Sequence, residues 1–416
     1  MPAFWRDAPP AARQALVAAG LGWMLDSFDV MLYALVLATL IREFDMTPAT
    51  AGLLGSLTLI ASAAGGIFFG FVADAYGRTR ALVWSVLIYA VFTAACGFAQ
   101  SVAQLAVFRI GLGLGMGGEW ASGAALVSET WPARHRGKAL GLMQSAWAVG
   151  YGLAAIVTAV VLPRWGWRAV FLVGILPALF ALWVRRSVPE PALWLEARAR
   201  RRSHPTERVG FSNTPVIFEI FGGLRGRLTL MITAMNACTM YAWWGFNLWI
   251  PAYLSLPPAR GGVGLSTVAM SGLIVAMQMG MWCGYVTFGY VSDAVGRKRA
   301  YVGYLVCAAT LVLLYASTRD ALALLILGPC VAFFGTGYFS GFGAVTAEVY
   351  PTHIRATAQG LTYNIGRIAS AAAPFAVGSL AETRGFGAAF TTASAAFVLA
   401  ALCWAWIPET RGRALE

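Results

Sequence analysis

The chain has 416 residues, of which 59% are hydrophobic and only 12% are charged. Soluble domains carry about 25% charged and 45–50% apolar residues, so this composition excludes a soluble enzyme, a disordered protein and a small disulfide scaffold. The net charge of +12 would suit nucleic acid binding unless the charges are placed for another reason.

Taken in chain order, the apolar runs between charged residues and Gly or Pro breaks predict twelve membrane-spanning helices, because a span needs about 20 apolar residues. The runs cover roughly 16–40, 51–73, 81–99, 104–127, 139–162, 168–184, 229–254, 266–288, 300–317, 321–345, 357–380 and 388–407. The six cysteines lie in these runs without paired spacing, which is typical of small buried side chains rather than disulfides or metal ligands.

The basic residues collect on one side of the predicted membrane. With the N-terminus in the cytoplasm, 22 of the 30 Lys and Arg fall in cytoplasmic segments. Six fall on the other side, and only Arg109 and Arg367 fall inside spans. The positive-inside rule therefore predicts a multi-pass protein of the inner membrane with both termini in the cytoplasm. This distribution accounts for the net charge without nucleic acid.

The two halves of the chain repeat each other. The segment 70–78 (GFVADAYGR) returns as 289–297 (GYVSDAVGR), at an offset of 219 residues (289 minus 70), and Glu129 and Pro189 meet Glu348 and Pro408 at the same offset. Duplication predicts an all-α membrane protein whose twelve transmembrane helices form two six-helix pseudo-symmetric bundles. The expected parts are an N-terminal segment 1–15, a bundle 16–184, a basic linker 185–228, a bundle 229–407 and a tail 408–416.

These motifs resemble those of the major facilitator superfamily. The Gly-x-x-x-Asp-x-x-Gly-Arg loops at 70–78 and 289–297 look like its first signature, and Arg109-x-x-x-Gly113-x-Gly115-x-Gly117 and Glu129-x-x-Pro132-x-x-x-Arg136-Gly137 resemble two others. The resemblance covers the whole chain. It implies the major facilitator fold, alternating access to a central site, and a monomer in the lipid bilayer.

A narrower likeness is to proton-coupled organic-acid symporters of the sialate, lactate-pyruvate and aromatic-acid types. It rests on Asp26-Ser27-Phe28-Asp29, Gly117-Gly118-Glu119-Trp120 and Asn364-x-Gly366-Arg367. Phosphate symporters share a similar layout. Ser27 stands where the aromatic-acid group usually has Gly, and span 229–254 lacks the His-containing motif of fungal lactate carriers, so the substrate stays open.

Five charged residues lie inside spans, and charges in the bilayer interior are expensive enough to suggest function. They are Asp26, Asp29, Arg109, Glu119 and Arg367. Asp26 and Asp29 share a helix face, and two close carboxylates in low dielectric cannot both ionise cheaply, so one is expected to hold a proton. The hypothesis is that Asp29 alternates between a proton and Arg109; the alternative is a permanent Asp29–Arg109 pair that orients two helices.

Glu119 and Arg367 each have two interpretations. Glu119 is interpreted as a second proton site near the substrate, or as a carboxylate tied to hydroxyls of spans one and two or to Trp120. Arg367 is interpreted as the anchor of an anionic substrate, because guanidinium binds a carboxylate through two parallel hydrogen bonds. The alternative for Arg367 is pairing with carbonyls, or a role in helix gating.

Span 229–254 is rich in aromatic residues, and aromatic faces with an amide suit a ring-bearing ligand. Most of these rings are attributed to an interfacial belt, but Tyr241 and Asn247 are predicted to line the substrate site. Weaker candidates for that site are Trp120, Gln144, Trp147, Tyr338, Tyr363 and Asn364.

Charged residues at the cytoplasmic ends of the spans form a separate, repeated set. The family likeness implies that they hold one conformation and release it, whereas simple surface charge would contribute little. The residues of this gating set are Asp74, Arg78, Glu129, Arg136, Asp293, Arg297, Glu348 and Arg355.

The sequence thus predicts a transporter and not an enzyme: a symporter that moves a small organic anion, expected to be a mono- or dicarboxylate, with protons. No cofactor or metal is expected, because the three histidines have no metal or triad spacing and no Gly-Lys-Ser/Thr phosphate loop occurs. The alternatives are a proton-coupled sugar or polyol symporter, a proton-coupled drug or cation exporter, and a sensor that uses the transport fold.

Overall fold

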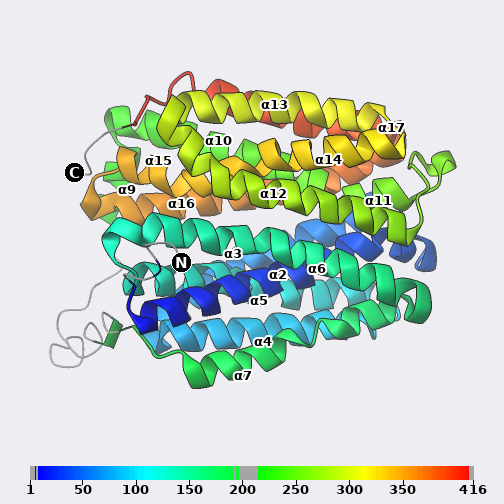
Figure 1. Cartoon of the computed structure of the whole chain (residues 1–416), viewed down its shortest axis with the longest axis horizontal. Coiled ribbons are helices and arrows are strands. Elements are labelled where there is room, and N and C mark those ends of the chain that lie inside the picture. The colour runs from blue at the N-terminus through cyan, green and yellow to red at the C-terminus, as the bar shows by residue number, and fades with distance from the viewer. Residues whose placement is uncertain (1–4, 6–7, 192–193, 196–213, 412–416) are drawn as a thin grey trace.

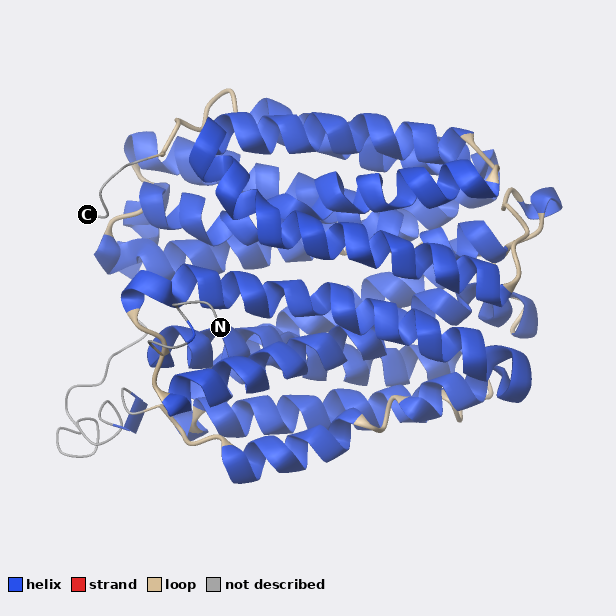
Figure 2. Cartoon of the chain, in the orientation of Figure 1, coloured by secondary structure: helices blue, strands red, loops and turns tan. Residues whose placement is uncertain are grey.

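The computed structural model describes residue 5 and residues 8–191, 194–195 and 214–411. All regular elements within these ranges are helices (Figures 1 and 2). The first half contains α2 (Pro10–Glu43), α3 (Pro48–Tyr76), α4 (Arg78–Cys96), α5 (Val102–Thr130), α6 (Ala133–Val173) and α7 (Pro177–Ser187). The second half contains α9 (Thr214–Phe221), α10 (Gly223–Asn247), α11 (Ile250–Ser255), η1 (Pro258–Arg260), α12 (Thr267–Val295), α13 (Arg297–Ser317), α14 (Ala321–Thr336), η2 (Gly337–Gly341), α15 (Phe342–Val349), α16 (Thr352–Ser370) and α17 (Ala372–Cys403).

Eight helical stretches in the described residues are long and apolar enough to cross a membrane. Two of them, Gly137–Ala181 and Ala358–Cys403, have 45 and 46 residues and fold back on themselves near Gly166 and Gly385, so each crosses twice. With α5 and α10 the chain crosses twelve times, and the all-α fold class with twelve transmembrane helices is confirmed. The helices lie in two groups, α2–α7 and α9–α17, with both chain ends toward the left in Figure 1, which we call the termini end.

The duplication extends to the capping residues at which helices begin and to the glycines at which the chain turns. Thr47 and Ser266 accept a hydrogen bond from the N–H three residues later and cap α3 and α12. Gly166 and Gly385 have positive φ angles of 75° and 80° at the two sharp turns, a backbone region that favours glycine. Each pair is separated by the same 219 residues. Side-chain caps satisfy N–H groups that a helix start leaves unpaired.

Two of the seams between the groups are formed by α3 with α17 and by α6 with α12. Along α3 and α17 the backbones touch: a Cβ added to Gly52 would collide with the carbonyl of Pro374, and one added to Gly378 would collide with that of Pro48. The Phe375 N–H donates to Ser56 Oγ across this seam at 3.2 Å. Along α6 and α12, Gly152 faces the side chain of Gln278. Contacts at the α3–α17 seam lie toward the end opposite the termini.

At the termini end of each bundle, a glutamate that follows the last span binds the start of an earlier helix of the same bundle. Glu190 accepts from the N–H groups of Thr79 and Arg80 at 3.1 and 3.2 Å. Glu409 accepts from those of Arg297 and Lys298 at 2.8 and 3.1 Å. Both acids therefore cap a helix start, where the helix dipole favours negative charge.

The pKa of Glu409 reflects the hydrogen bonds of its cap. Partial burial acts to raise the pKa of Glu409, but four backbone N–H groups outweigh it and hold the pKa below its usual range. These donors belong to Arg411, Arg297, Lys298 and Thr410. The carboxylate stays ionised and bound to the first turn of α13.

Candidate functional site

Three buried carboxylates gather between α2 and α5. Asp26 and Asp29 are each 1% exposed and Glu119 is 0% exposed. The Glu119 carboxylate lies against Gly22, where an added Cβ would collide with its Oε1 atom. Gly22 precedes Asp26 by about one helical turn, and Asp26 is the charged neighbour of both other acids. The sequence-predicted acids are thus one cluster.

The oxygens of this cluster are largely unpartnered. Within the described chain, both oxygens of Asp29, both of Glu119 and Oδ2 of Asp26 make no hydrogen bond. The Thr93 hydroxyl lies near Asp29 but donates to the carbonyl of Tyr89 at 2.8 Å. Buried polar groups are nearly always hydrogen-bonded in proteins, so such a set marks a functional site rather than a stabilising one. No hydroxyl among the described residues bonds Glu119, and the suggested tie to Trp120 concerns a side chain outside them.

Arg109 of α5 is buried and lies beside Tyr33 rather than beside an acid. Its guanidinium carbon is 4.0 Å from the centre of the Tyr33 ring, a cation–π contact. The Tyr33 hydroxyl donates to the carbonyl of Ala51 at 2.8 Å, which fixes the ring. No ion pair joins Arg109 to Asp29, since the carboxylate oxygens of Asp29 have no partner. The structure therefore contains the unpaired arrangement, and the exchange of Asp29 between a proton and Arg109 stays a prediction.

Arg367 brings a cation from the second bundle to the acids of the first. It lies in the last turn of α16, is 5% exposed, and is the positive charge that acts on Asp26. The helix is interrupted directly after it: α16 ends at Ser370, and Pro374 near the start of α17 has no N–H to continue the ladder. Arg367 is thus buried at the boundary between the bundles.

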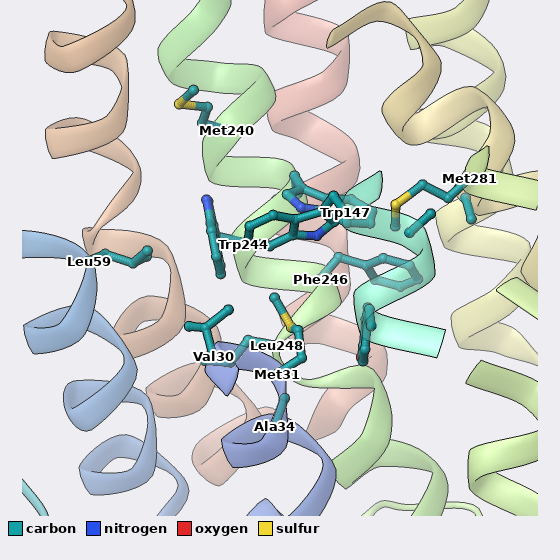
Figure 3. Close-up of a cluster of buried hydrophobic side chains, with 14 of the residues drawn as sticks. Val30, Met31, Ala34, Leu59, Trp147, Met240, Trp244, Phe246, Leu248 and Met281 are labelled. Atoms are coloured by element: carbon teal, nitrogen blue, oxygen red, sulfur yellow. The ribbon is translucent and has the colours of Figure 1, made fainter. Parts of the chain in front are cut away.

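Indole rings form one wall of the same region. The rings of Trp23 and Trp147 are 4.7 Å apart, and those of Trp147 and Trp244 are 6.0 Å apart. Figure 3 shows Trp147 of α6 and Trp244 of α10 together with Met281 of α12 in one cluster. The Ser27 hydroxyl donates to the carbonyl of Trp147 at 2.8 Å, which ties α2 to α6. Trp23 and Trp244 were not among the sequence-predicted site residues, although Trp23 shares a helix face with Asp26.

The other predicted substrate residues are distributed differently. Asn247 donates to the sulfur of Met31 in the opposite bundle at 3.8 Å, and its Oδ1 atom has no partner. Gln144 lies beside Tyr285, and Tyr363 beside Arg367. The remaining ones turn elsewhere: Asn364 donates to the carbonyl of Gly360, Tyr338 packs within its own bundle against Phe339, and Tyr241 is half-buried on α10.

The predicted gating residues form matching ion pairs at the termini end. Arg78 bonds Glu129 at 3.0 Å, and the equivalent Arg297 bonds Glu348 at 3.0 Å. Arg297 also contacts Asp293 at 2.6 Å. Each pair joins helices of one bundle. The side chains of Asp74, Trp120, Arg136 and Arg355 lie outside the described residues.

The chain is similar to known proteins over nearly its whole length. Residues 19–286 and 255–415 match the Major Facilitator Superfamily. A protein of Haemophilus influenzae named as a metabolite transport protein is 34% identical over 407 residues, covering 97% of this chain and 98% of that protein. The cis,cis-muconate transport protein of Acinetobacter baylyi is 33% identical over 392 residues, covering 92% and 91%. The niacin transporter NiaP of the same species is 30% identical over 422 residues, covering 95% and 94%.

A solved structure shares the fold. The xylose transporter XylE from E. coli, in a partially occluded inward open conformation, superposes with a TM-score of 0.77 at 19% identity, covering 98% of this chain and all of that one (100%). The likeness supports the twelve-helix architecture. The substrate has to be inferred from the residues of the site.

Proposed function

This chain belongs to the major facilitator superfamily, and we propose that it is a symporter that carries a small organic anion together with protons by alternating access. It is a transporter and not an enzyme, as its relatives are. The observation that carries the proposal is the cluster of unpartnered carboxylates beside Arg367 at the junction of the two bundles.

The acids supply the proton sites. An ionised carboxylate that is buried without partners is costly, and binding a proton removes that cost. Asp29 and Glu119 meet this description with both oxygens free of hydrogen bonds. In the proposal Asp29 exchanges its proton for Arg109, which in the present arrangement rests on Tyr33. Asp29 can thus be protonated and neutral while the Arg109 guanidinium rests on Tyr33, and it is ionised when it pairs with Arg109, which stays charged throughout.

Arg367 supplies the anion site. A buried guanidinium needs an opposite charge, and a carboxylate satisfies it with two parallel hydrogen bonds. Flat indole rings nearby suit a planar acid, and muconate and niacin, named for two relatives, are small organic acids. Each proton that enters with the substrate contributes about 2.3 kcal/mol per 100 mV of membrane potential. The first proton offsets the equal cost of carrying a monoanion inward, and further protons or an acidic outside drive uphill uptake.

The rest of the proposal concerns orientation and assembly. The excess of Lys and Arg supports an inner-membrane location with both termini in the cytoplasm. The seam contacts of α3 and α17 then lie on the outer side, so the present arrangement is closed toward the outside. We propose the bundles 16–184 and 229–407 as the moving halves of a monomer in the bilayer, with protons as the coupling ion and no other cofactor.

The test uses purified protein in liposomes that enclose a pH-sensitive dye, with protein-free liposomes as background because weak acids cross bilayers unaided. Benzoates, nicotinate, muconate, lactate, sialate, phosphate, sugars and cationic drugs are added one at a time. We expect proton entry with an organic acid, and its loss to background in Asp29→Asn. The matched control is Asp45→Asn, in an exposed loop with a positive φ of 47° that Asn tolerates. Proton entry with sugars only would contradict an anion substrate.

A glycine substitution tests the position of Glu119 without replacing any charged residue. Gly22→Ala places a methyl group onto the Glu119 carboxylate, whereas Gly20→Ala on the same helix meets nothing within 4 Å. We expect Gly22→Ala to lower the proton-coupled uptake rate at least about tenfold, because displacements of about 1 Å at a reacting centre have effects of this size. Gly20→Ala is expected to remain near wild type. Equal rates in the two variants would contradict the packing of Glu119 on Gly22.

A further inference from the structure

Gln278 is a buried amide with no hydrogen-bond partner. It lies on α12, is 4% exposed, and neither its Oε1 nor its Nε2 atom is bonded within the described chain. Its Cβ and Cγ atoms lie 3.7 and 3.8 Å from the position of a Cβ on Gly152 of α6. The amide is therefore at the seam between the two bundles. A buried amide that leaves both of its polar atoms unused calls for a ligand or another partner.

A second unpartnered polar group lies in the same layer. The hydroxyl of Tyr151, the residue before Gly152, is fully buried and has no hydrogen-bond partner. Tyr151 neighbours Tyr315, whose hydroxyl contacts the sulfur of Met277 at 3.9 Å, directly before Gln278 in the chain. The groups gathered here are an amide, phenols and a thioether, and none of them is ionised.

This layer adjoins the aromatic wall of the site. Gln278, Met281 and Tyr285 follow one face of α12, since residues three and four apart lie above one another. Met281 belongs to the same cluster as Trp147 (Figure 3), and Trp147 and Tyr151 are four residues apart on α6. Both helices thus place their unpartnered group about one turn, or about 5 Å, beyond the Trp147 level, toward the end opposite the termini.

We propose that Gln278 and the Tyr151 hydroxyl form a subsite that binds a neutral hydrogen-bonding group of the substrate, a hydroxyl or a ring nitrogen. This inference rests on the proposed function. The substrate is then a planar monocarboxylate that places its carboxylate at Arg367, its ring against Trp147 and Trp244, and its neutral polar group at Gln278. An amide both donates and accepts, so it matches a hydroxyl in either direction and donates to a ring nitrogen. The Gln278 amide carries no positive charge that could pair with a second carboxylate, so the subsite disfavours dicarboxylates.

The test compares benzoate, 3- and 4-hydroxybenzoate, nicotinate and muconate as probes of proton entry in the liposome assay. We expect the wild type to show a KM at least about tenfold lower for a hydroxybenzoate or nicotinate than for benzoate. In Gln278→Met, which keeps length but removes the amide, this difference disappears while the KM for benzoate stays unchanged. Tyr151→Phe, which removes only the unpartnered hydroxyl, is expected to reduce it. Gln104→Met, on the exposed start of α5, is the matched control and keeps the difference.

Three outcomes would overturn the proposal. A wild type that moves benzoate and its hydroxylated or pyridine analogues equally well leaves the symport intact but removes the subsite. Equal losses for benzoate and the analogues in Gln278→Met and Tyr151→Phe assign both groups a structural role. If none of the acids moves protons in any variant, the proposed function is wrong, and the subsite proposal that rests on it is wrong too.

Discussion

Replacement of Glu119 by Gln is expected to leave substrate exchange intact and to abolish accumulation driven by a pH gradient. Glutamine fills the same space against Gly22 and resembles the protonated acid, but it cannot release a proton. The Glu119→Gln carrier would stay in the loaded form and shuttle substrate without proton movement. The measurements are counterflow of radiolabelled substrate at equal pH and uptake against a gradient with the outside acidic.

The matched control for this experiment is Glu43→Gln. Glu43 is an exposed acid at the end of α2 whose partner is Arg168 at 3.4 Å, and exposed pairs of this kind contribute about 0–1 kcal/mol. Both transport modes should survive in the control. Loss of exchange together with accumulation in Glu119→Gln would show that the carboxylate is needed for structure or substrate binding, and would remove Glu119 from the proton path.

Substitution of Arg367 by Lys is expected to raise the KM for the organic acid about tenfold or more, with expression and stability retained. Lysine keeps the charge but has no planar fork to bind both carboxylate oxygens. Loss of one charge-assisted hydrogen bond is worth about 1.5–3 kcal/mol, and about 1.4 kcal/mol corresponds to a factor of ten. The measurement is the concentration dependence of proton entry in liposomes.

Arg168→Lys provides the same exchange outside the site. Arg168 is half-exposed, pairs with Glu43 and stacks on Trp167 at 4.2 Å, so its replacement should leave the KM unchanged. An unchanged KM in Arg367→Lys would show that Arg367 does not hold the carboxylate. It would then favour the alternative in which Arg367 pairs with carbonyls or serves helix gating.

The sequence alone predicted the membrane class, the twelve spans and the charged members of the site. Apolar runs near 20 residues and a repeat at one offset are read directly from the order of residues. Asp26, Glu119 and Arg367 stand out because charge is rare inside apolar helices. The sequence did not show that the acids lie together; the structure brings Glu119 against Gly22, about one helical turn before Asp26.

Other parts of the site depend on how the helices rotate and meet, which a single sequence does not encode locally. Arg109 lies on the Tyr33 ring instead of pairing with Asp29. Which side chain lies next to Arg109 depends on how α2 and α5 are rotated toward each other. Trp23 and Trp244 look like ordinary apolar residues until two bundles bring them to Trp147. Gln278 gave no signal in the sequence, because a lone amide in a helix has meaning only once its partners are known to be absent.

The glutamates that cap α4 and α13 also bear on how the protein is made. Glu190 binds the first turn of α4 within its own half, and Glu409 does the same for α13. The first half therefore has all the partners of its cap as soon as Glu190 has left the ribosome, before the second half exists. Domains generally fold as units during synthesis, N-terminal first. Because the cap is duplicated, each half contains all the residues that form its own cap. Two separately expressed halves can therefore each form the cap before they associate in the membrane.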